Sequence, residues 1–236
     1  MTRPIAWHRI HVLIIDLDNT LCDTLHTLSH VQWRRVESAF KRKGWTREMV
    51  ALHAGFGKHS FLHSLKSARL TPTQIRFAIR VYDAVDVTKL TLFPDAGSLL
   101  AVPLSKILLS RGEPSLQRKK IKHLKIRSQF SEVRIVPTFE RKHAVLQDIL
   151  AEHNLHPKEA LVIGDRIEEE IADARSLGIP AVLVRRPDWP VGKSRVKPDM
   201  VVRDLHVIAR ALRGASHARV GLVKKKNIVT KKKNRH

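Results

Sequence analysis

The stretch of sequence that decides the fold is His11-Val12-Leu13-Ile14-Ile15-Asp16-Leu17-Asp18-Asn19-Thr20-Leu21. Five mostly apolar, β-prone residues (11–15) run directly into two aspartates one residue apart, and a polar turn follows. A buried strand that ends in acids places them at the carboxyl edge of a parallel sheet, where open α/β folds bind their ligands. Two carboxylates this close repel each other unless a cation lies between them or one carries a proton. The stretch therefore predicts a magnesium site, a nucleophile beside a proton donor, or both.

The length and the composition suit one core domain with a modest insertion. The chain has 236 residues, of which 43% are hydrophobic, and this is enough to fill one core. No apolar run approaches the roughly 18 residues that span a bilayer, and the apolar segment near Ile14 is too short and too close to acids for a signal peptide. The single cysteine, Cys22, excludes an intramolecular disulfide. We therefore expect a cytoplasmic protein in which Cys22 is a small loop or core residue, rather than a reactive thiol.

The net charge of +22 is unusually high. The tail 224–236 carries seven of the 44 basic residues and no acid, so most of the excess lies in the folded part, and we expect the tail to be disordered. Such a charge attracts phosphate-bearing molecules and favours weak contact with RNA or DNA through the tail. Aromatic residues make up only 5% of the chain, which argues against a platform for stacking bases.

The residues after the acidic strand are typical of helices. Apolar residues recur at helical spacing from about Thr24 to Leu92, and Thr71-Pro72 is a helix start. Phe93-Pro94-Asp95 then closes the segment. Because this is too much helix for a simple crossover, residues 24–92 are predicted to form an inserted helical cap domain.

Beyond residue 93, short apolar runs alternate with helical patterns. Strands are expected over 107–109, 133–136, 160–163, 181–184 and 200–202, with helices over 116–123, 143–153 and 168–177. Such alternation predicts an α/β fold, with a Rossmann-like parallel-sheet core covered by helices on both faces. The predicted core is 10–23 and 93–212, the cap is 24–92, and 213–236 is a basic tail.

Polar side chains follow several of the expected strands. The second strand ends in Ser110-Arg111-Gly112, the third is followed by Arg141 and Lys142, and the fourth ends in Gly164-Asp165 with Glu168, Glu169 and Glu170 close behind. Acids for a cation, together with a hydroxyl and cations for a phosphate, would meet at one sheet edge. This is the equipment of phosphoryl transfer.

With these motifs the chain resembles hydrolases of the haloacid dehalogenase superfamily, over residues from about 10 to 212. Asp16-Leu17-Asp18-Asn19-Thr20 matches the first motif, Ser110 the second, and Gly164-Asp165 with the following acids the fourth. The third motif is a lysine, which falls at Lys142 in preference to its neighbour Arg141. The helical insertion resembles the helical (C1-type) cap of the superfamily's phosphoglycolate phosphatase-like branch.

The resemblance implies a role for each matching residue. Asp16 would be the nucleophile that becomes an aspartyl phosphate, and Asp18 would be the general acid and base. Asp16, the main-chain carbonyl of Asp18, and Asp165 would bind Mg²⁺, a cation that prefers oxygen ligands. Ser110 and Lys142 would bind the phosphoryl group, with Arg111 as a further phosphate contact. Supporting residues would be Asn19, Thr20, Arg141, Glu169 and Glu170.

We therefore expect a magnesium-dependent phosphatase that acts on a small phosphorylated metabolite. Dehalogenases of the superfamily lack the second aspartate, so Asp18 disfavours dehalogenation. An alternative is a nucleic-acid-associated protein that uses the fold as a scaffold and binds RNA or DNA through its basic tail and surface. A dense basic segment beside Ser110 either steers anionic substrates or is the exposed face of a helix; it comprises Lys106, Arg111, Arg118, Lys119, Lys120, Lys122, Lys125 and Arg127.

Overall fold

A six-stranded parallel sheet forms the centre of the molecule. The computed structural model describes residues 4–54, 61–188 and 194–215, apart from the side chains of Leu62 and His63. The strand order is β3-β2-β1-β4-β5-β6, and every neighbouring pair is parallel. The strands are β1 (Val12–Ile15), β2 (Ser105–Arg111), β3 (Glu132–Val136), β4 (Ala160–Gly164), β5 (Ala181–Val184) and β6 (Met200–Val202). The predicted α/β class and all the predicted strands are confirmed.

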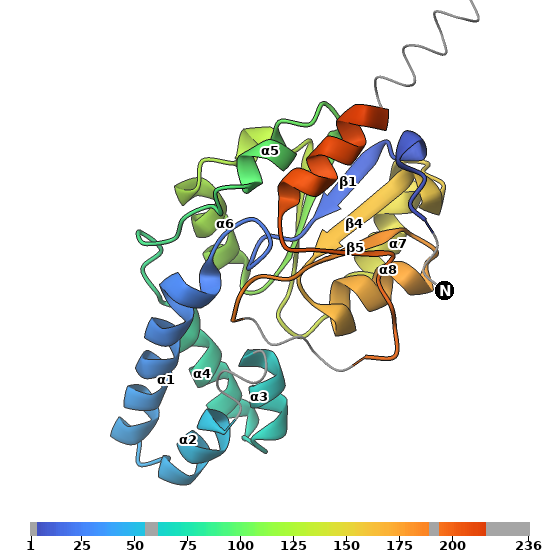
Figure 1. Ribbon diagram of the computed structural model, residues 1–236. Coiled ribbons are helices and arrows are strands. Elements are labelled where there is room, and N and C mark those ends of the chain that lie inside the picture. The colour runs from blue at the N-terminus through green and yellow to red at the C-terminus, as the bar shows by residue number, and fades with distance from the viewer. Residues whose placement is uncertain (1–3, 55–60, 189–193, 216–236) are drawn as a thin grey trace, which may run out of the picture.

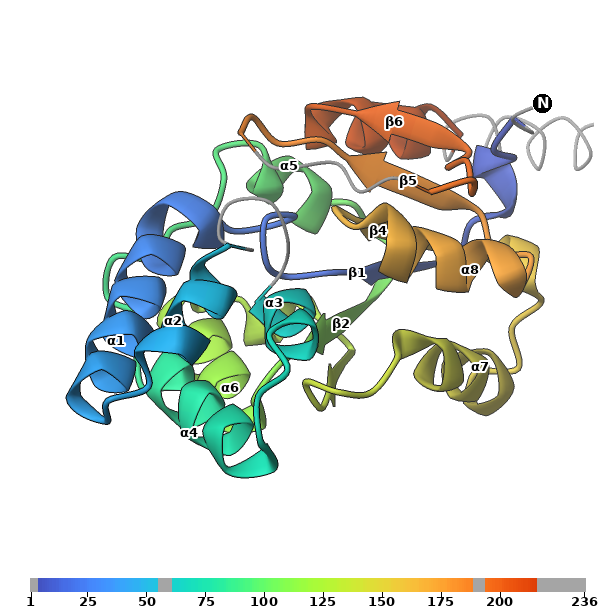
Figure 2. The ribbon, with the colours of Figure 1, turned by 90° about the horizontal axis from the view of Figure 1, so that it is seen from below.

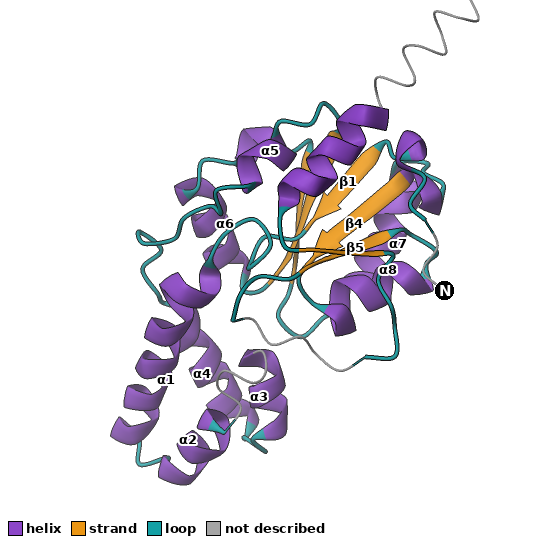
Figure 3. Cartoon of the chain, in the orientation of Figure 1, coloured by secondary structure: helices purple, strands orange, loops and turns teal. Residues whose placement is uncertain are grey.

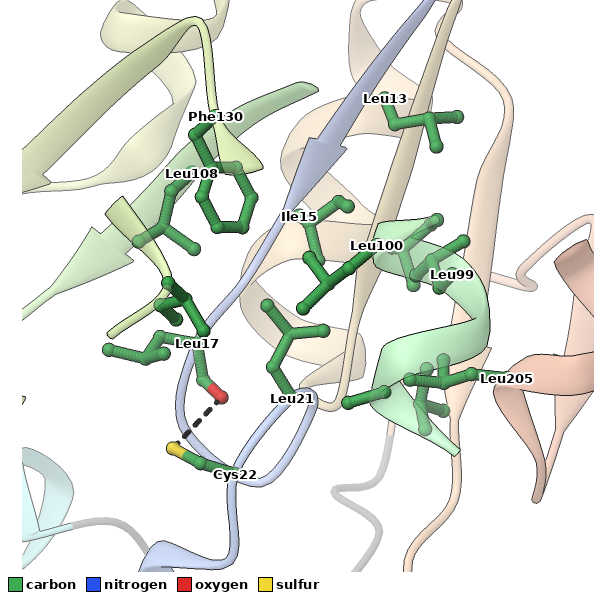
Figure 4. Packing of buried hydrophobic residues seen from close by; sticks show 14 of the residues in the cluster. Leu13, Ile15, Leu17, Leu21, Cys22, Leu99, Leu100, Leu108, Phe130 and Leu205 are labelled. Atoms are coloured by element: carbon green, nitrogen blue, oxygen red, sulfur yellow. Dashed lines mark hydrogen bonds between the residues drawn. The ribbon is translucent and has the colours of Figure 1, made fainter. Parts of the chain in front are cut away.

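Strand β1 lies in the middle of the sheet because it is apolar on both faces. Its four residues are buried, and successive side chains of a strand point to opposite faces. Leu13 and Ile15 belong to one core cluster, together with Leu99, Leu108 and Phe130 (Figure 4). Val12 and Ile14 belong to a second cluster on the other face.

Helices cover both faces of the sheet (Figure 3). On one face lie α5 (Ala96–Leu100), α6 (Pro114–His123) and a C-terminal helix over 205–215. On the other lie α7 (Lys142–Glu152) and α8 (Ala172–Ser176), the latter extended at its start by the π-helical turn η5 (Ile167–Ile171). Short 3₁₀ turns are η1 (Trp7–Arg9), η3 (Arg127–Gln129) and η4 (Pro157–Glu159).

The helical insertion has its own core, and we call this insertion the cap. It consists of the π-helical turn η2 (Leu25–Ser29), α1 (His30–Arg42), α2 (Thr46–His53), α3 (Phe61–Ser67) and α4 (Pro72–Asp83). The cap contains a separate cluster of buried side chains, which includes Trp33, Val36 and Phe40. The helix start at Thr71-Pro72 is confirmed, because the Thr71 side chain accepts from the Gln74 amide and Gln74 reaches back in a capping box.

The expectation of helix throughout 24–92 is wrong for residues 84–92. These residues form turns and an extended segment that returns to the core. Cys22 and Leu92 make an antiparallel bridge, and the Asp23 amide donates to the Thr91 carbonyl at 3.1 Å. The two cap linkers therefore run side by side, because pairing with each other satisfies their backbone groups.

The cap lies beyond the carboxyl ends of the strands. In Figure 1 the strands β1 and β4 point toward α1–α4, and Figure 2 shows the same arrangement from below. The side chains that follow the strands therefore lie between core and cap. No helix in the described part of the chain is long and apolar enough to cross a membrane.

Candidate active site

Asp16 lies at the end of β1 in an ion-paired cluster. Its amide donates to the Ile163 carbonyl of β4 at 2.9 Å, which fixes the backbone beside Gly164 and Asp165. The Lys142 Nζ donates to Asp16 Oδ1 at 2.5 Å and to Glu170 Oε1 at 2.6 Å. Lys142 comes from the start of α7 and Glu170 from η5. The cluster thus joins three segments around one ammonium group.

The contacts distinguish Lys142 from Arg141. Lys142 is 1% exposed; burial alone would lower its pKa, but Asp16 and Glu170 outweigh burial and raise it. The ammonium is therefore charged. Arg141 points elsewhere, because its guanidinium donates to Asp173 and its side chain is 69% exposed. Of the two candidates for the lysine motif, the geometry favours Lys142.

The approach of Glu170 to the sheet depends on a glycine. A Cβ added at Gly164 would lie 2.8 Å from Cγ of Glu170. Glu170 is 4% exposed, and its second oxygen accepts from the Arg166 amide at 3.1 Å. Gly164 therefore leaves the space in which Glu170 binds both Lys142 and the main chain after β4.

Asp16 and Asp165 form a site that suits a divalent cation. Burial raises the pKa of Asp16 to about 7, with Glu170 and Asp18 adding to the effect of burial and Lys142 opposing it. Burial also raises the pKa of Asp165 well above its usual range, and Glu170 and Asp16 contribute. Within the described residues, Asp165 Oδ2 is buried without a hydrogen-bond partner. Such an oxygen is a ligand suited to a hard cation, which would also stabilise both carboxylates.

The donor set is small. In the described part of the chain, no three His, Cys, Asp or Glu side chains come together as a ready-made metal cluster. A cation at Asp16 and Asp165 would therefore take its remaining oxygens from the main chain, water or a ligand, as Mg²⁺ commonly does. The residues present thus fit Mg²⁺ better than a metal that needs several imidazole or thiolate ligands.

Asp18 is bound by residues that the sequence did not single out for it. Lys120 donates to its Oδ1 at 2.7 Å, Gln117 donates to its Oδ2 at 3.1 Å, and the Thr24 hydroxyl also donates to it. Burial alone would raise the pKa of Asp18, but the charge of Lys120 and these hydrogen bonds outweigh burial and lower it. Asp18 is therefore a carboxylate in this state of the molecule.

The helical periodicity of α6 could have identified Gln117 and Lys120 as residues on the buried side of the helix. Gln117 and Lys120 are three residues apart, and they share a helix side with the buried residues Leu116 and Ile121. Lys120 is 3% exposed, whereas Arg118, Lys119 and Lys122 are exposed. The basic segment is therefore an exposed helix face in part, and one of its lysines serves the site.

The remaining predicted site residues differ in where their side chains lie and in what these side chains contact. Asn19 has a φ of 55° and its side chain accepts from the Leu25 amide at 2.9 Å, so it shapes the turn into the cap. Arg111 pairs with Glu169 at 2.5 Å. Ser110 and Thr20 are wholly buried, and their hydroxyls have no hydrogen-bond partner within the described part of the chain. Neither is among the described residues that line the cavity next to Asp16.

A cavity of about 450 Å³ lies between core and cap. The core contributes Asp16, Asp18 and Asp165, and the cap contributes polar and aromatic side chains from η2, α1, α3 and α4. This volume is within the range of small-molecule sites, about 300–1,000 Å³. Cys22 is buried behind Asp18 and burial raises the pKa of its thiol, so its predicted role as a core residue is confirmed. Of the predicted basic tail 213–236, residues 213–215 instead continue the C-terminal helix, and residues 216–236 lie outside the described residues.

A parallel sheet whose carboxyl edge presents buried acids and a lysine to a cavity beneath an inserted helical domain defines the class of capped α/β proteins. The family model described as haloacid dehalogenase-like hydrolase matches residues 13–184, from β1 through the cap to the end of β5. The chain therefore belongs to this family of hydrolases, as the sequence motifs predicted.

Individual relatives agree with the family. Phosphoserine phosphatase of Thermus thermophilus is 28% identical over 172 residues, which are 68% of this chain and 67% of that protein. The structure resembles a haloacid dehalogenase-like hydrolase from Streptococcus pneumoniae with a TM-score of 0.65 and 23% identity, covering 86% of this chain and 98% of the other. It also resembles a HAD hydrolase from Bacillus subtilis bound to magnesium, with a TM-score of 0.60, 16% identity and coverage of 86% and 99%. The two structural likenesses establish the fold.

Proposed function

We propose that this protein is a magnesium-dependent phosphatase that hydrolyses a small phosphomonoester through an aspartyl phosphate on Asp16. The observation that carries the proposal is the pair of acids that follow β1. Asp16 is bound by a buried ammonium, and Asp18 is bound separately by Lys120 and Gln117. The two acids thus have different surroundings, as a nucleophile and an acid–base group need. The similarity to a phosphoserine phosphatase and to a magnesium-bound hydrolase supports this reading.

The first step needs Asp16 as a carboxylate. One of its oxygens attacks phosphorus while the bond from phosphorus to the ester oxygen breaks, and a proton from Asp18 goes to the departing alkoxide. Substrate binding brings a phosphate next to Asp18, and this negative charge raises the pKa of Asp18 toward the protonated form. Lys142 keeps the Asp16 carboxylate oriented.

The second step uses Asp18 as a carboxylate. As a carboxylate it takes a proton from water, and the water oxygen attacks phosphorus while the bond from phosphorus to Asp16 breaks. Inorganic phosphate leaves and Asp16 is again a carboxylate. Mg²⁺ bound by Asp16, the Asp18 carbonyl and Asp165 would supply neutralisation of the phosphate charge. Arg111, which lines the cavity, is proposed as a further phosphate contact; Ser110 is not among the described lining residues, and its phosphate contact stays a prediction from the sequence.

The test is hydrolysis of p-nitrophenyl phosphate with Mg²⁺ by the full-length protein. Asp16→Asn should lower kcat/KM by at least about a thousandfold, because the amide is no nucleophile. Asp18→Asn should slow the second step, so that a protein with the mass of one added phosphoryl group accumulates. Asp148→Asn, at an exposed position of α7, is the control that keeps full activity. Full activity of Asp16→Asn would refute the mechanism.

The metal has a test that does not depend on activity. Mg²⁺ binding to the folded state should raise the thermal midpoint of the wild type, since a ligand that binds only the folded state stabilises it. The same Mg²⁺ concentration should leave the midpoint of Asp165→Asn unchanged. An equal rise in both proteins would remove Asp165 from the metal site.

The geometry of this site bears on neither nucleic-acid binding nor cellular location, which are two predictions from the sequence. The nucleic-acid alternative depends on the tail, which lies outside the described residues, and stays a prediction. The cytoplasmic location, which was inferred from the cysteine content, also stays a prediction.

A further inference from the structure

The cavity has an acidic lining although the chain as a whole is strongly basic. Among the described lining residues, seven are Asp or Glu and four are Lys or Arg. Lys142 binds Asp16 and Glu170, Lys120 binds Asp18, and Arg111 binds Glu169. The fourth cation, Arg166, lies among Asp165, Glu169 and Glu170. Asp16, Asp18 and Asp165 are assigned to the metal and the phosphoryl group in the proposed mechanism. Each of the four cations in the described lining is already matched by an acid, which disfavours a leaving group that carries its own negative charge.

The cap side of the cavity presents an aromatic wall of Trp33, Phe61 and Tyr82. Phe61 and Tyr82 stack with ring centroids 3.8 Å apart, and Trp33 meets Phe61 edge-on at 5.5 Å. Ile79 also lines this side. Rings fixed by mutual packing form a preorganised surface for the carbon skeleton of a ligand, and polar groups around such a surface set its orientation.

Besides Asp165, three of the polar side chains that line the cavity carry a buried oxygen without a hydrogen-bond partner in the described part of the chain, and Gln32 is the first. Gln32 lines the cavity and is 1% exposed. Its Nε2 donates to the Tyr82 carbonyl at 3.2 Å, which fixes the orientation of the amide. Within the described residues, the Gln32 Oε1 is then a buried oxygen without a hydrogen-bond partner.

Two further lining residues repeat this pattern. Gln117 is 3% exposed, and its Nε2 donates to Asp18 Oδ2 and to the Arg111 carbonyl, each at 3.1 Å. Its Oε1 and the Asp83 Oδ2 are likewise buried without a hydrogen-bond partner in the described part of the chain. A buried acceptor without a donor is costly, so three around one cavity indicate a ligand that brings donors.

We propose that the leaving group of the phosphomonoester is rich in hydrogen-bond donors, hydroxyl or ammonium, and that Gln32, Asp83 and Gln117 accept from it. The inference rests on the proposed phosphatase function and specifies the substrate class of that site. A polyol, a sugar or an amino alcohol has this chemistry. An unsubstituted alkyl chain offers no donor, and a carboxylate would meet an acidic lining.

The experiment compares four phosphate esters on one three-carbon skeleton, with Mg²⁺ and the full-length protein. Propyl phosphate has no donor, glycerol 3-phosphate has hydroxyls, 3-aminopropyl phosphate has an ammonium and 2-carboxyethyl phosphate has a carboxylate. We expect kcat/KM for the hydroxyl or the ammonium ester to exceed that for the propyl ester at least about tenfold, since unpaired buried groups reject a ligand without donors. The carboxylate ester should be no better than the propyl ester.

Variants assign the preference to these residues. Gln32→Leu, close to isosteric, should reduce the advantage of the donor-bearing ester over propyl phosphate by about tenfold, whereas Gln147→Leu, at an exposed position of α7, should leave it unchanged. Asp83→Asn distinguishes the two donors, because loss of the carboxylate charge should weaken turnover of the ammonium ester more than that of the glycerol ester. Thermal midpoints establish that each variant is folded.

The outcomes separate this inference from the function on which it rests. Equal kcat/KM for propyl and donor-bearing esters, a preference for the carboxylate ester, or an equal loss on all four esters in Gln32→Leu would overturn the inference while leaving a phosphatase. Failure to hydrolyse any phosphomonoester, p-nitrophenyl phosphate included, would overturn the proposed function itself.

Discussion

Two buried lysines bind the two aspartates that follow β1, one lysine to each aspartate. Lys142 is bound by Asp16 and Glu170, and Lys120 is bound by Asp18. Both lysines are at most 3% exposed, so neither charge is compensated by bulk water. Removing one partner of a buried ion pair leaves an uncompensated charge, which costs more than the pair contributes. Single substitutions at these lysines should therefore affect both stability and activity.

Lys142→Met tests this at the nucleophile. We expect the free energy of unfolding to fall by about 3 kcal/mol, because Asp16 and Glu170 are left buried together, and kcat/KM to fall at least about a hundredfold. Urea unfolding and the p-nitrophenyl phosphate assay measure the two effects. The neighbouring Arg141→Met is the matched control and should keep nearly full activity, since the exposed Arg141 side chain contacts Asp173 and not Asp16. Equal effects of the two substitutions on kcat/KM would contradict the choice of Lys142.

Asp83 should make stability depend on pH. Burial raises its pKa to about 7, against about 3.9 in an unfolded chain. The unfolded state therefore loses this proton first, and the contribution of Asp83 to stability decreases as pH rises from about 4 to about 7. Asp83→Asn should be more stable than the wild type by about 1–2 kcal/mol at pH 8, after allowance for partial exposure, and equal to it near pH 4.

Urea unfolding at the two pH values measures the difference for Asp83→Asn. Asp86→Asn, whose exposed carboxylate accepts hydrogen bonds from Thr88, is the control. If Asp83→Asn raised the free energy of unfolding equally at both pH values, the raised pKa of Asp83 would not be the source of the added stability.

The elements that form the site meet at one edge of the sheet. In-register pairing of β1 with β4 aligns Ile15 with Ile163, so Asp16 and Gly164 lie side by side in the next position. The turn η5 then brings Glu170 back over Gly164, so close that a Cβ added at Gly164 would lie 2.8 Å from Glu170 Cγ. The spacing between strand and helix is thus set by a glycine.

Gly164→Ala should disturb this packing. The added Cβ would lie 2.8 Å from the Glu170 side chain, and such overpacking costs about 1–3 kcal/mol. Because the displaced carboxylate also binds Lys142, phosphatase activity should fall as well. Gly97→Ala in α5 has nothing within 4 Å of its Cβ and should be neutral or stabilising by about 0.5–1 kcal/mol. Urea unfolding distinguishes them, and an unaffected Gly164→Ala would contradict the close approach.

At the scale of the whole molecule, two paired linkers connect the cap to the core. Arg186 binds both linkers where they leave the core. Its guanidinium donates to both oxygens of Asp95, at 2.7 and 2.9 Å, and to the Thr20 carbonyl at 2.8 Å. It also lies 3.9 Å over the ring of Phe93. Thr20 precedes the cap and Phe93 follows it, so one side chain binds both ends of the connection.

Arg186→Lys should weaken this junction, because an ammonium cannot reproduce the two-pronged contact with Asp95 or the planar stacking on Phe93. We expect the free energy of unfolding to fall by about 2 kcal/mol. The adjacent Arg185→Lys is exposed and should change stability by less than about 0.5 kcal/mol. Thermal and urea unfolding provide the comparison, and equal stabilities would remove Arg186 from this role.

Local sequence was sufficient for the fold and for part of the site. Asp16, Asp18 and Asp165 could be assigned because each follows an apolar run, and the end of a strand is readable from neighbouring residues. The cap was predicted from its helical periodicity, but the return segment 84–92 was not, because short extended linkers form by pairing with distant residues. Lys120 was placed in a basic helix face, since nothing near it in the sequence indicates the aspartate that it binds.

The sequence by itself therefore determined the parallel sheet, the inserted cap and the acids at the sheet edge, because these depend on patterns that span a few residues. The sequence favoured Lys142 over Arg141, and the tertiary structure added the contact of Lys142 with Asp16. Tertiary structure alone decided that Lys120 binds Asp18 and that Gln32 and Asp83 line the cavity. Lys142 is 126 residues from Asp16, and Lys120 is 102 residues from Asp18. The physical reason is that such contacts depend on helix phase and on the packing of separate segments, which no local pattern records.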